Sequence, residues 1–171
     1  LDKILEFLYS DKKSELVAEV SFAKYAYQNY SSIMENSEQR VATITNLQAA
    51  KKVAMKDIEF YMSDLTDAVN SKSGSDINAL VDKIFRIKEC LELSMQLYVM
   101  SGMLEVYYSS NRDAGYLQWL EDDAVTYLSK CEKRMLSCFS MLSMQIHNYK
   151  DNPLKKIDKE PLIRRVDAVI D

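Results

Sequence analysis

The residues that most constrain this chain are 90–108, CLELSMQLYVMSGMLEVYY, which form the most apolar stretch of the sequence. Between residues 76 and 110 there is no proline, and Gly102 is the only glycine. Apolar residues recur there at spacings of three or four, as on one face of a helix; they are Ile77, Leu80, Ile84, Ile87, Leu91, Met95, Tyr98 and Gly102. The sequence therefore predicts a long helix without an internal break.

A second apolar stripe on this segment predicts contacts on more than one side of the helix; its members are Leu93, Leu97, Met100, Leu104 and Tyr107. A membrane span is the alternative, because about 20 apolar residues cross a bilayer. Glu92, Glu105 and the interspersed serine and glutamine residues argue against it, since polar groups are costly in hydrocarbon. We therefore interpret the stretch as a buried central helix, and we do not expect a membrane location.

The composition is typical of a folded globular protein. A chain of 171 residues fits one domain with a substantial core, and 47% apolar and 28% charged residues exclude a disordered chain. Only three glycines and two prolines predict few turns and long elements. The net charge of −4 gives no electrostatic support for a nucleic-acid partner, so none is expected.

Capping and turn residues divide the chain into helices. Residues 10–14, SDKKS, predict a break, because serine and aspartate cap helix starts. Asn36 with Gln39 resembles a capping box. Residues 71–76, SKSGSD, and 111–115, NRDAG, predict turns in which glycine ends one helix and a polar residue caps the next. Four long helices are predicted, at roughly 12–35, 38–72, 76–110 and 114–150.

The predicted fold class is all-α, an up-and-down bundle of four long antiparallel helices with short flanking helices. Residues 41–69 carry a heptad-like apolar pattern through Val41, Ile44, Met55, Ile58, Met62, Leu65 and Val69, flanked by Leu47, Ala54, Tyr61 and Ala68. Polar residues interrupt it, which favours an intramolecular bundle over a long coiled coil. One continuous helix over residues 14–72 is the alternative. Residues 1–150 are assigned to the bundle domain and residues 151–171 to a C-terminal extension, with a short helix opened by Pro161.

The side chains that carry chemistry are sparse. Cys90, Cys131 and Cys138 form no paired framework, which predicts reduced thiols in the core and a cytoplasmic location. His147 is the only histidine, and we interpret it as a surface residue near a helix C-terminus. No phosphate loop, dinucleotide fingerprint, nucleophile elbow or zinc motif occurs. We therefore expect neither an enzyme nor a bound cofactor or metal.

The sequence holds eleven tyrosines and one tryptophan. Tyr116 and Trp119 follow the second predicted turn, where they could anchor a protein partner at one end of the bundle. The alternative is that these aromatic residues only cover the open end of the core.

The expected function is a non-enzymatic protein-protein interaction module that binds its partner in the helix-in-groove manner. The identity of that partner stays open, and so does a homo-oligomer. The chain begins with Leu1 and ends in a helix-compatible pattern, so we expect it to be part of a larger protein or assembly. The alternatives are a four-helix sensor or ligand-binding domain of a signalling protein, and a helical membrane-active protein.

Overall fold

The structure is a computed structural model that describes residues 2–71, 76–109, 118–150 and 156–171. Helices account for 91% of the described residues, and no strand occurs among them. The all-α fold class predicted from the apolar periodicity is therefore confirmed.

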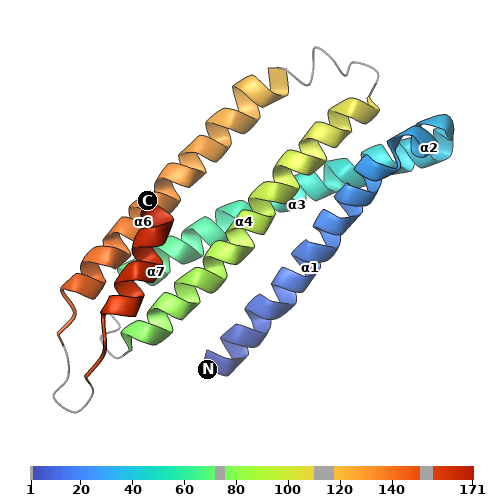
Figure 1. The fold of residues 1–171 in the computed structure, drawn as a ribbon. Helices are drawn as coiled ribbons and strands as arrows, with labels where there is room; N and C mark the ends of the chain where they lie inside the picture. The colour runs from blue at the N-terminus through green and yellow to red at the C-terminus, as the bar shows by residue number, and fades with distance from the viewer. Residues whose placement is uncertain (1, 72–75, 110–117, 151–155) are drawn as a thin grey trace.

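Figure 1 shows the order of the helices along the chain. They are α1 (Asp2–Gln28), α2 (Tyr30–Glu35), α3 (Ser37–Asn70), α4 (Ile77–Tyr108), the π-helical segment η1 (Trp119–Ala124), α6 (Val125–His147) and α7 (Glu160–Ile170). The predicted turn at 111–115 and Gly74 of the turn at 71–76 lie outside the described residues.

The break predicted at residues 10–14 is wrong, because α1 continues through this segment. Residues 11–14 are exposed, so their polar side chains face water while the backbone remains helical. Two contacts hold this part of α1: Lys13 Nζ lies 2.9 Å from a Glu89 carboxylate oxygen, and Lys12 Nζ lies 4.7 Å from the Phe60 ring centroid. Serine and aspartate are preferred at helix caps, but their presence does not force a helix to end.

The joint predicted at Asn36 is confirmed. Its side-chain oxygen accepts hydrogen bonds from the backbone N–H groups of Glu38 and Gln39, at 3.1 and 3.2 Å. Asp76 caps α4 in the same way, through the N–H groups of Asn78 and Ala79. These caps satisfy donors that have no partner inside the helix. The alternative of a single helix over residues 14–72 is therefore wrong.

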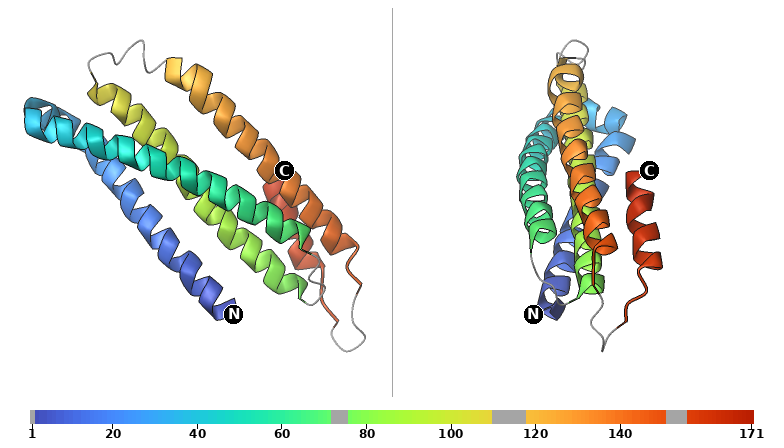
Figure 2. Two further views of the ribbon diagram at one scale, coloured as in Figure 1. Left: turned by 180° about the vertical axis from the view of Figure 1, so that it is seen from behind. Right: turned by 90° about the vertical axis from the view of Figure 1, so that its left-hand side faces the viewer.

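The long helices alternate in direction along the chain, as Figure 1 and the left-hand view of Figure 2 show. The central helix α4 packs against α3 and α1, and α3 also contacts α6. In the right-hand view of Figure 2, α3 lies on one side of the layer formed by α1, α4 and α6, whereas α7 lies on the other side. The apolar stretch at residues 90–108, which belongs to α4, thus lies in the middle of the molecule.

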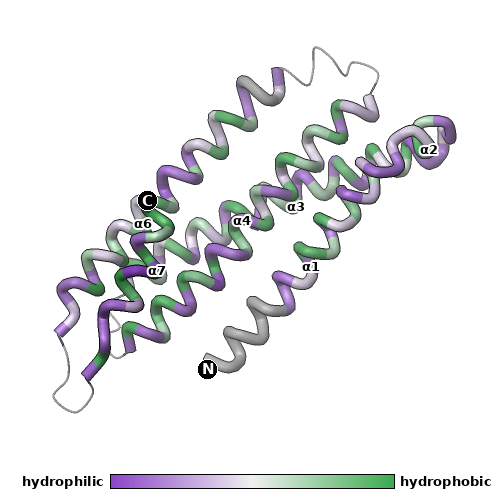
Figure 3. The backbone as a smooth tube through the Cα atoms, viewed as in Figure 1, coloured by the Kyte–Doolittle hydropathy of each residue, from purple (hydrophilic) through white to green (hydrophobic). Residues whose placement is uncertain are grey.

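Burial along α4 explains this central place. Its side chains at Ile84, Ile87, Leu91 and Leu97 have no exposed surface, so both predicted stripes contribute to the core. Figure 3 shows hydrophobic residues along the whole length of α4. A second, smaller apolar cluster lies near α2 and consists of Ala23, Ala26, Ile33, Leu47, Leu104 and Tyr108. No described helix is long and apolar enough to cross a membrane.

The inward face of α3 differs from the predicted one at two residues. Val41 and Met55 are 63% and 40% exposed, although both belong to the heptad-like pattern. The flanking residues at strict seven-residue spacing are buried instead: Leu47, Ala54, Tyr61 and Ala68. Such a repeat follows the seam between two closely packed helices, and α3 makes its most extensive contact with α4.

The C-terminal helix α7 forms as predicted, with Pro161 in its first turn. Leu162 and Val166 are buried and belong to the main apolar cluster. Arg165 stacks on the Phe85 ring, 4.0 Å from its centroid, and lies 2.7 Å from an Asp82 carboxylate oxygen. Residues of the predicted extension therefore pack against α4 and α6.

Candidate functional site

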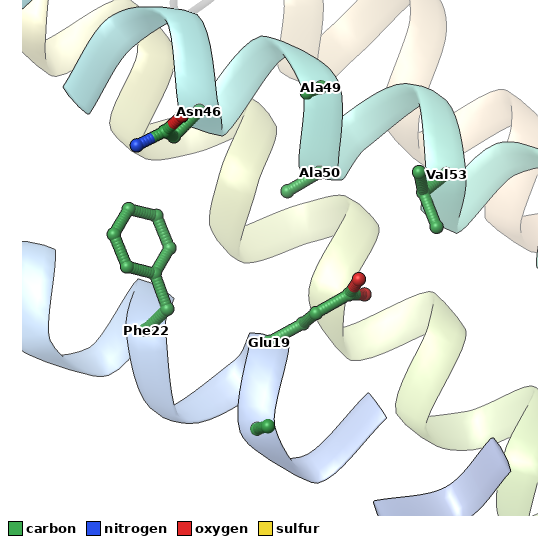
Figure 4. Close-up of a pocket in the computed structure, with 7 residues that line it drawn as sticks. Glu19, Phe22, Asn46, Ala49, Ala50 and Val53 are labelled. Atoms are coloured by element: carbon green, nitrogen blue, oxygen red, sulfur yellow. The ribbon is translucent and has the colours of Figure 1, made fainter. Parts of the chain in front are cut away.

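The surface between α1 and α3 is hollowed because the two helices pack on α4 but make few contacts with each other. The hollow, here called the α1–α3 groove, has a volume of about 380 Å³ (Figure 4). Its lining is mostly small or apolar: Ala18, Glu19, Phe22, Asn46, Ala49, Ala50 and Val53. Alanine side chains leave both helix backbones open to close approach by another element.

The longer side chains of the groove reach across it. Figure 4 shows the Phe22 ring extending from α1 toward Asn46 on α3, and the Glu19 side chain extending toward Val53. Val53 is 40% exposed, and Phe22 is only partly buried against the smaller apolar cluster. The groove therefore presents apolar surface to solvent, with one carboxylate at its centre.

A smaller hollow of about 100 Å³ extends the groove toward the start of α1. It shares Glu19 and Val53 with the groove and adds Lys12, Glu15, Leu16, Asp57 and Tyr61. Among these residues three carboxylates face one ammonium group. Negative charge at this end is therefore only partly compensated.

The titration of these carboxyls reflects that imbalance. Burial raises the pKa of Glu19, and the neighbouring charges of Asp57 and Glu15 raise it further. Burial also raises the pKa of Asp57, although Lys12 opposes that shift. Loss of water and nearby like charges both disfavour the ionised acid. A cation brought into the groove would relieve this repulsion.

Of the two contact residues predicted from the sequence, Tyr116 and Trp119, the structure describes only Trp119. Tyr116 lies outside the described residues. Trp119 is half-buried and begins η1, with its ring centroid 5.6 Å from that of Tyr98. The indole lies directly on Gly102, where an added Cβ would meet the indole Cζ2 at 2.3 Å. Its role as a protein contact stays a prediction, since its ring also packs against the main cluster.

Trp119 lines a second hollow of about 390 Å³, here called the aromatic hollow. The residues around it come from α3, α4, η1 and α6: Lys51, Met55, Tyr98, Trp119, Asp122, Asp123, Thr126, Tyr127 and Lys130. The Tyr98 and Tyr127 ring centroids are 5.4 Å apart, with the ring planes inclined at 57°. The Tyr127 hydroxyl donates a hydrogen bond of 2.9 Å to a Glu59 carboxylate oxygen.

Electrostatics at the aromatic hollow keep both tyrosines protonated. Burial raises the pKa of Tyr98, and the negative charge of Asp123 adds to the shift. Burial likewise raises the pKa of Tyr127, reinforced by its hydrogen bond to Glu59. Neutral rings keep the negative face that attracts cations.

Among the described residues no group of three or more His, Cys, Asp or Glu side chains could hold a metal ion. Cys90, Cys131 and Cys138 are buried, as predicted, and none of them forms a disulfide. Burial raises the pKa of both Cys90 and Cys131, which disfavours the reactive thiolate. His147 is exposed in the last turn of α6, where the sequence places it.

Both hollows leave only weak signals in the sequence. The groove is marked by adjacent small residues, Ala49 and Ala50, on a helix whose partner face could not be known in advance. The aromatic hollow is marked by Gly102, the single glycine inside a long helix, which lets the indole approach the backbone.

Comparisons with models of protein families, with curated proteins and with solved structures found no match to this chain.

Proposed function

We propose that this protein is a non-enzymatic helical interaction module that binds a partner helix in the α1–α3 groove. In this proposal α1, α3, α4 and α6 form an up-and-down bundle that serves as a rigid scaffold within a larger protein or assembly. The groove, with its small-residue walls, the partly buried Phe22 and the exposed Val53, is the observation that supports the proposal. The three cysteines form no disulfide, which supports a cytoplasmic location.

The dimensions of the groove suit a helical segment. Together with the smaller hollow that extends the groove, the α3 wall runs from Asn46 to Asp57, which corresponds to about 16 Å at 1.5 Å per residue. This length matches about three turns of a docked helix. Alanines at Ala18, Ala49 and Ala50 would let the partner backbone approach closely, while its apolar side chains contact Phe22 and Val53.

The charge of the groove restricts the partner further. Glu15, Glu19 and Asp57 leave excess negative charge beside the apolar surface. A partner helix with an apolar face and one central lysine or arginine would complement both features. We therefore expect an amphipathic, locally basic helix as the occupant.

The experiment places a photo-crosslinking amino acid at Val53 in cells that naturally produce the protein. Val125 on α6 is the matched control, because it is also an exposed valine, at 53% exposure against 40%. A partner should crosslink through Val53 and not through Val125, and its crosslinked peptide should be amphipathic and basic. Crosslinks that are equal at both positions, or a partner segment without these properties, would refute the proposal.

Binding of the purified partner then provides a quantitative test by calorimetry. Ala49→Trp should weaken the Kd about ten-fold or more, since the indole fills the groove. Ala168→Trp is the matched control, because this alanine is exposed and belongs to α7, which lies on the other side of the α1, α4 and α6 layer from α3 (Figure 2). Glu19→Gln should weaken the Kd about five-fold through loss of one partly exposed charge pair. A Kd unchanged by Ala49→Trp would exclude the groove as the binding site.

A four-helix sensor domain that binds a small molecule is the second candidate function. The aromatic hollow favours it, because its volume of about 390 Å³ lies in the range of small-molecule sites.

A further inference from the structure

The aromatic hollow combines three features that one ligand class would use together. Tyr98 lies between two other rings, with centroids 5.6 Å from Trp119 and 5.4 Å from Tyr127. The Tyr98 ring is inclined at 50° to that of Trp119 and at 57° to that of Tyr127, so neither pair forms a flat stack. A cation is attracted to an aromatic ring when it lies within about 6 Å of the centroid. Because Tyr98 is only 3% exposed, it forms the base of the hollow, and a cation would contact mainly the half-buried rings of Trp119 and Tyr127.

The charges around the hollow also favour a cation. Asp122 and Asp123 line it, and the Tyr127 hydroxyl holds the Glu59 carboxylate beside it. Of the two lysines that line the hollow, Lys51 is paired with Glu105 at 2.8 Å, so its charge is balanced. Three carboxylates therefore stand against Lys130.

The backbone beside the hollow has an unusual conformation that brings the indole into place. Trp119 opens the π-helical segment η1, and such segments are rare and recur at functional sites. Across from it, Gly102 has no side chain, and the indole occupies the space where a Cβ would lie. Both features hold the ring against α4 beside Tyr98. A simple solvent-facing cover for the bundle end would require neither.

We propose that the aromatic hollow binds the quaternary or methylated ammonium group of an organic cation, held by the rings of Tyr98, Trp119 and Tyr127 and by the carboxylates of Asp122 and Asp123. A methylated ammonium suits this site better than a metal ion, because it is weakly hydrated and makes no demand for several oxygen ligands. The site is separate from the α1–α3 groove, since the two hollows share no lining residue. The proposal therefore does not depend on the interaction module.

The experiment uses choline as the probe, with 3,3-dimethylbutan-1-ol as its uncharged carbon analogue of the same shape. Trp119 is the only tryptophan of the chain, so intrinsic tryptophan fluorescence reports on this hollow alone. Choline should change the emission saturably, with a Kd of about 1 mM, at an ionic strength held constant with sodium chloride. The neutral analogue should bind at least about ten-fold more weakly, because it lacks the cation–π attraction.

Two variants assign the effect to the hollow. Tyr127→Leu should weaken choline binding about ten-fold by removing one ring, and Asp123→Asn about three-fold by removing one charge. Tyr25→Leu, at a tyrosine that is 58% exposed on α1, is the control and should leave the Kd unchanged. Circular dichroism verifies that each variant is folded. Because Asp123 is exposed, its variant remains informative even if Tyr127→Leu fails to fold.

The outcomes separate the possibilities. No saturable change up to about 50 mM choline, or equal binding of the neutral analogue, would overturn the proposal. Equal Kd values for the wild type and Asp123→Asn, with an intact fold, would also overturn it. A peptide carrying trimethyllysine serves as a second probe of the same headgroup. Tighter binding of choline assigns a small molecule, and tighter binding of the peptide assigns a modified protein.

Discussion

Replacing Gly102 by alanine tests the contact between α4 and the Trp119 indole. A Cβ at this position would lie 2.3, 2.6 and 2.9 Å from three atoms of the Trp119 indole. Carbon atoms in contact are normally about 3.5–4.0 Å apart, so the indole or α4 must shift by about 1 Å. The indole is half-buried, and we expect it to move toward solvent.

Two opposing effects set the change in stability. Alanine favours the interior of a helix over glycine by about 1 kcal/mol. Forcing an extra carbon into a packed contact costs about 1–3 kcal/mol. The net expectation is a loss of about 1 kcal/mol, which lowers the Tm by roughly 2–4 °C for a chain of this size. In a Trp119→Ala background the clash is absent, so Gly102→Ala should instead stabilise the protein by about 1 kcal/mol.

A double-mutant cycle measured by urea denaturation checks this reversal of sign. Tryptophan emission of the single variant Gly102→Ala should also shift to the red, because the displaced indole meets more water. The reasoning would be refuted if Gly102→Ala stabilised the protein equally with and without Trp119. That result would mean that the indole does not rest on α4.

Three further predictions follow from burial and charge. Leu97→Ala should lower the free energy of unfolding by about 2–5 kcal/mol in urea denaturation, because the side chain is fully buried. Met144→Ala, at a side chain that is 64% exposed, should change it by no more than about 0.5 kcal/mol. Similar losses in the two variants would place Leu97 on the surface. A thiol reagent should label the native protein far more slowly than the denatured one, since Cys90 and Cys131 are buried and their pKa values are raised, and fast native labelling would contradict the core assignment. The pKa of Glu19 is raised above its ordinary value of 4.5, so the contribution of this group to stability is complete below pH 4.5 and is lost as the pH rises through the raised pKa. Glu19→Gln should remove this pH-dependent loss of stability. Identical stability profiles against pH for the two proteins would exclude the shift.

The sequence was sufficient for features that depend on neighbouring residues. Helical periodicity over residues 76–110 predicts α4 and its buried Leu97 because burial on two sides leaves two stripes in the sequence itself. The caps at Asn36 and Asp76 are equally local, since each side chain bonds to N–H groups two and three residues further along. Long-range structure does not alter such bonds.

Local sequence patterns did not predict the structure correctly where contacts with distant residues decide between two locally possible conformations or helix faces. The segment 10–14 could end a helix or continue it, and contacts of Lys12 and Lys13 with Phe60 and Glu89 accompany its continuation. Likewise, the wide apolar stripe of α3 does not specify which of its edges faces inward. The packing against α4 selects the edge through Leu47 and leaves Met55 exposed.

Both candidate sites belong to this second class. The groove exists because α1 and α3 rest on α4 while making few contacts with each other, and no spacing within either helix encodes that separation. The aromatic hollow brings Gly102, Trp119 and Tyr127 together from α4, η1 and α6. The sequence identified Trp119 as an aromatic residue after a turn. Only the tertiary structure placed its indole on a glycine of another helix, because that contact depends on the packing of whole helices.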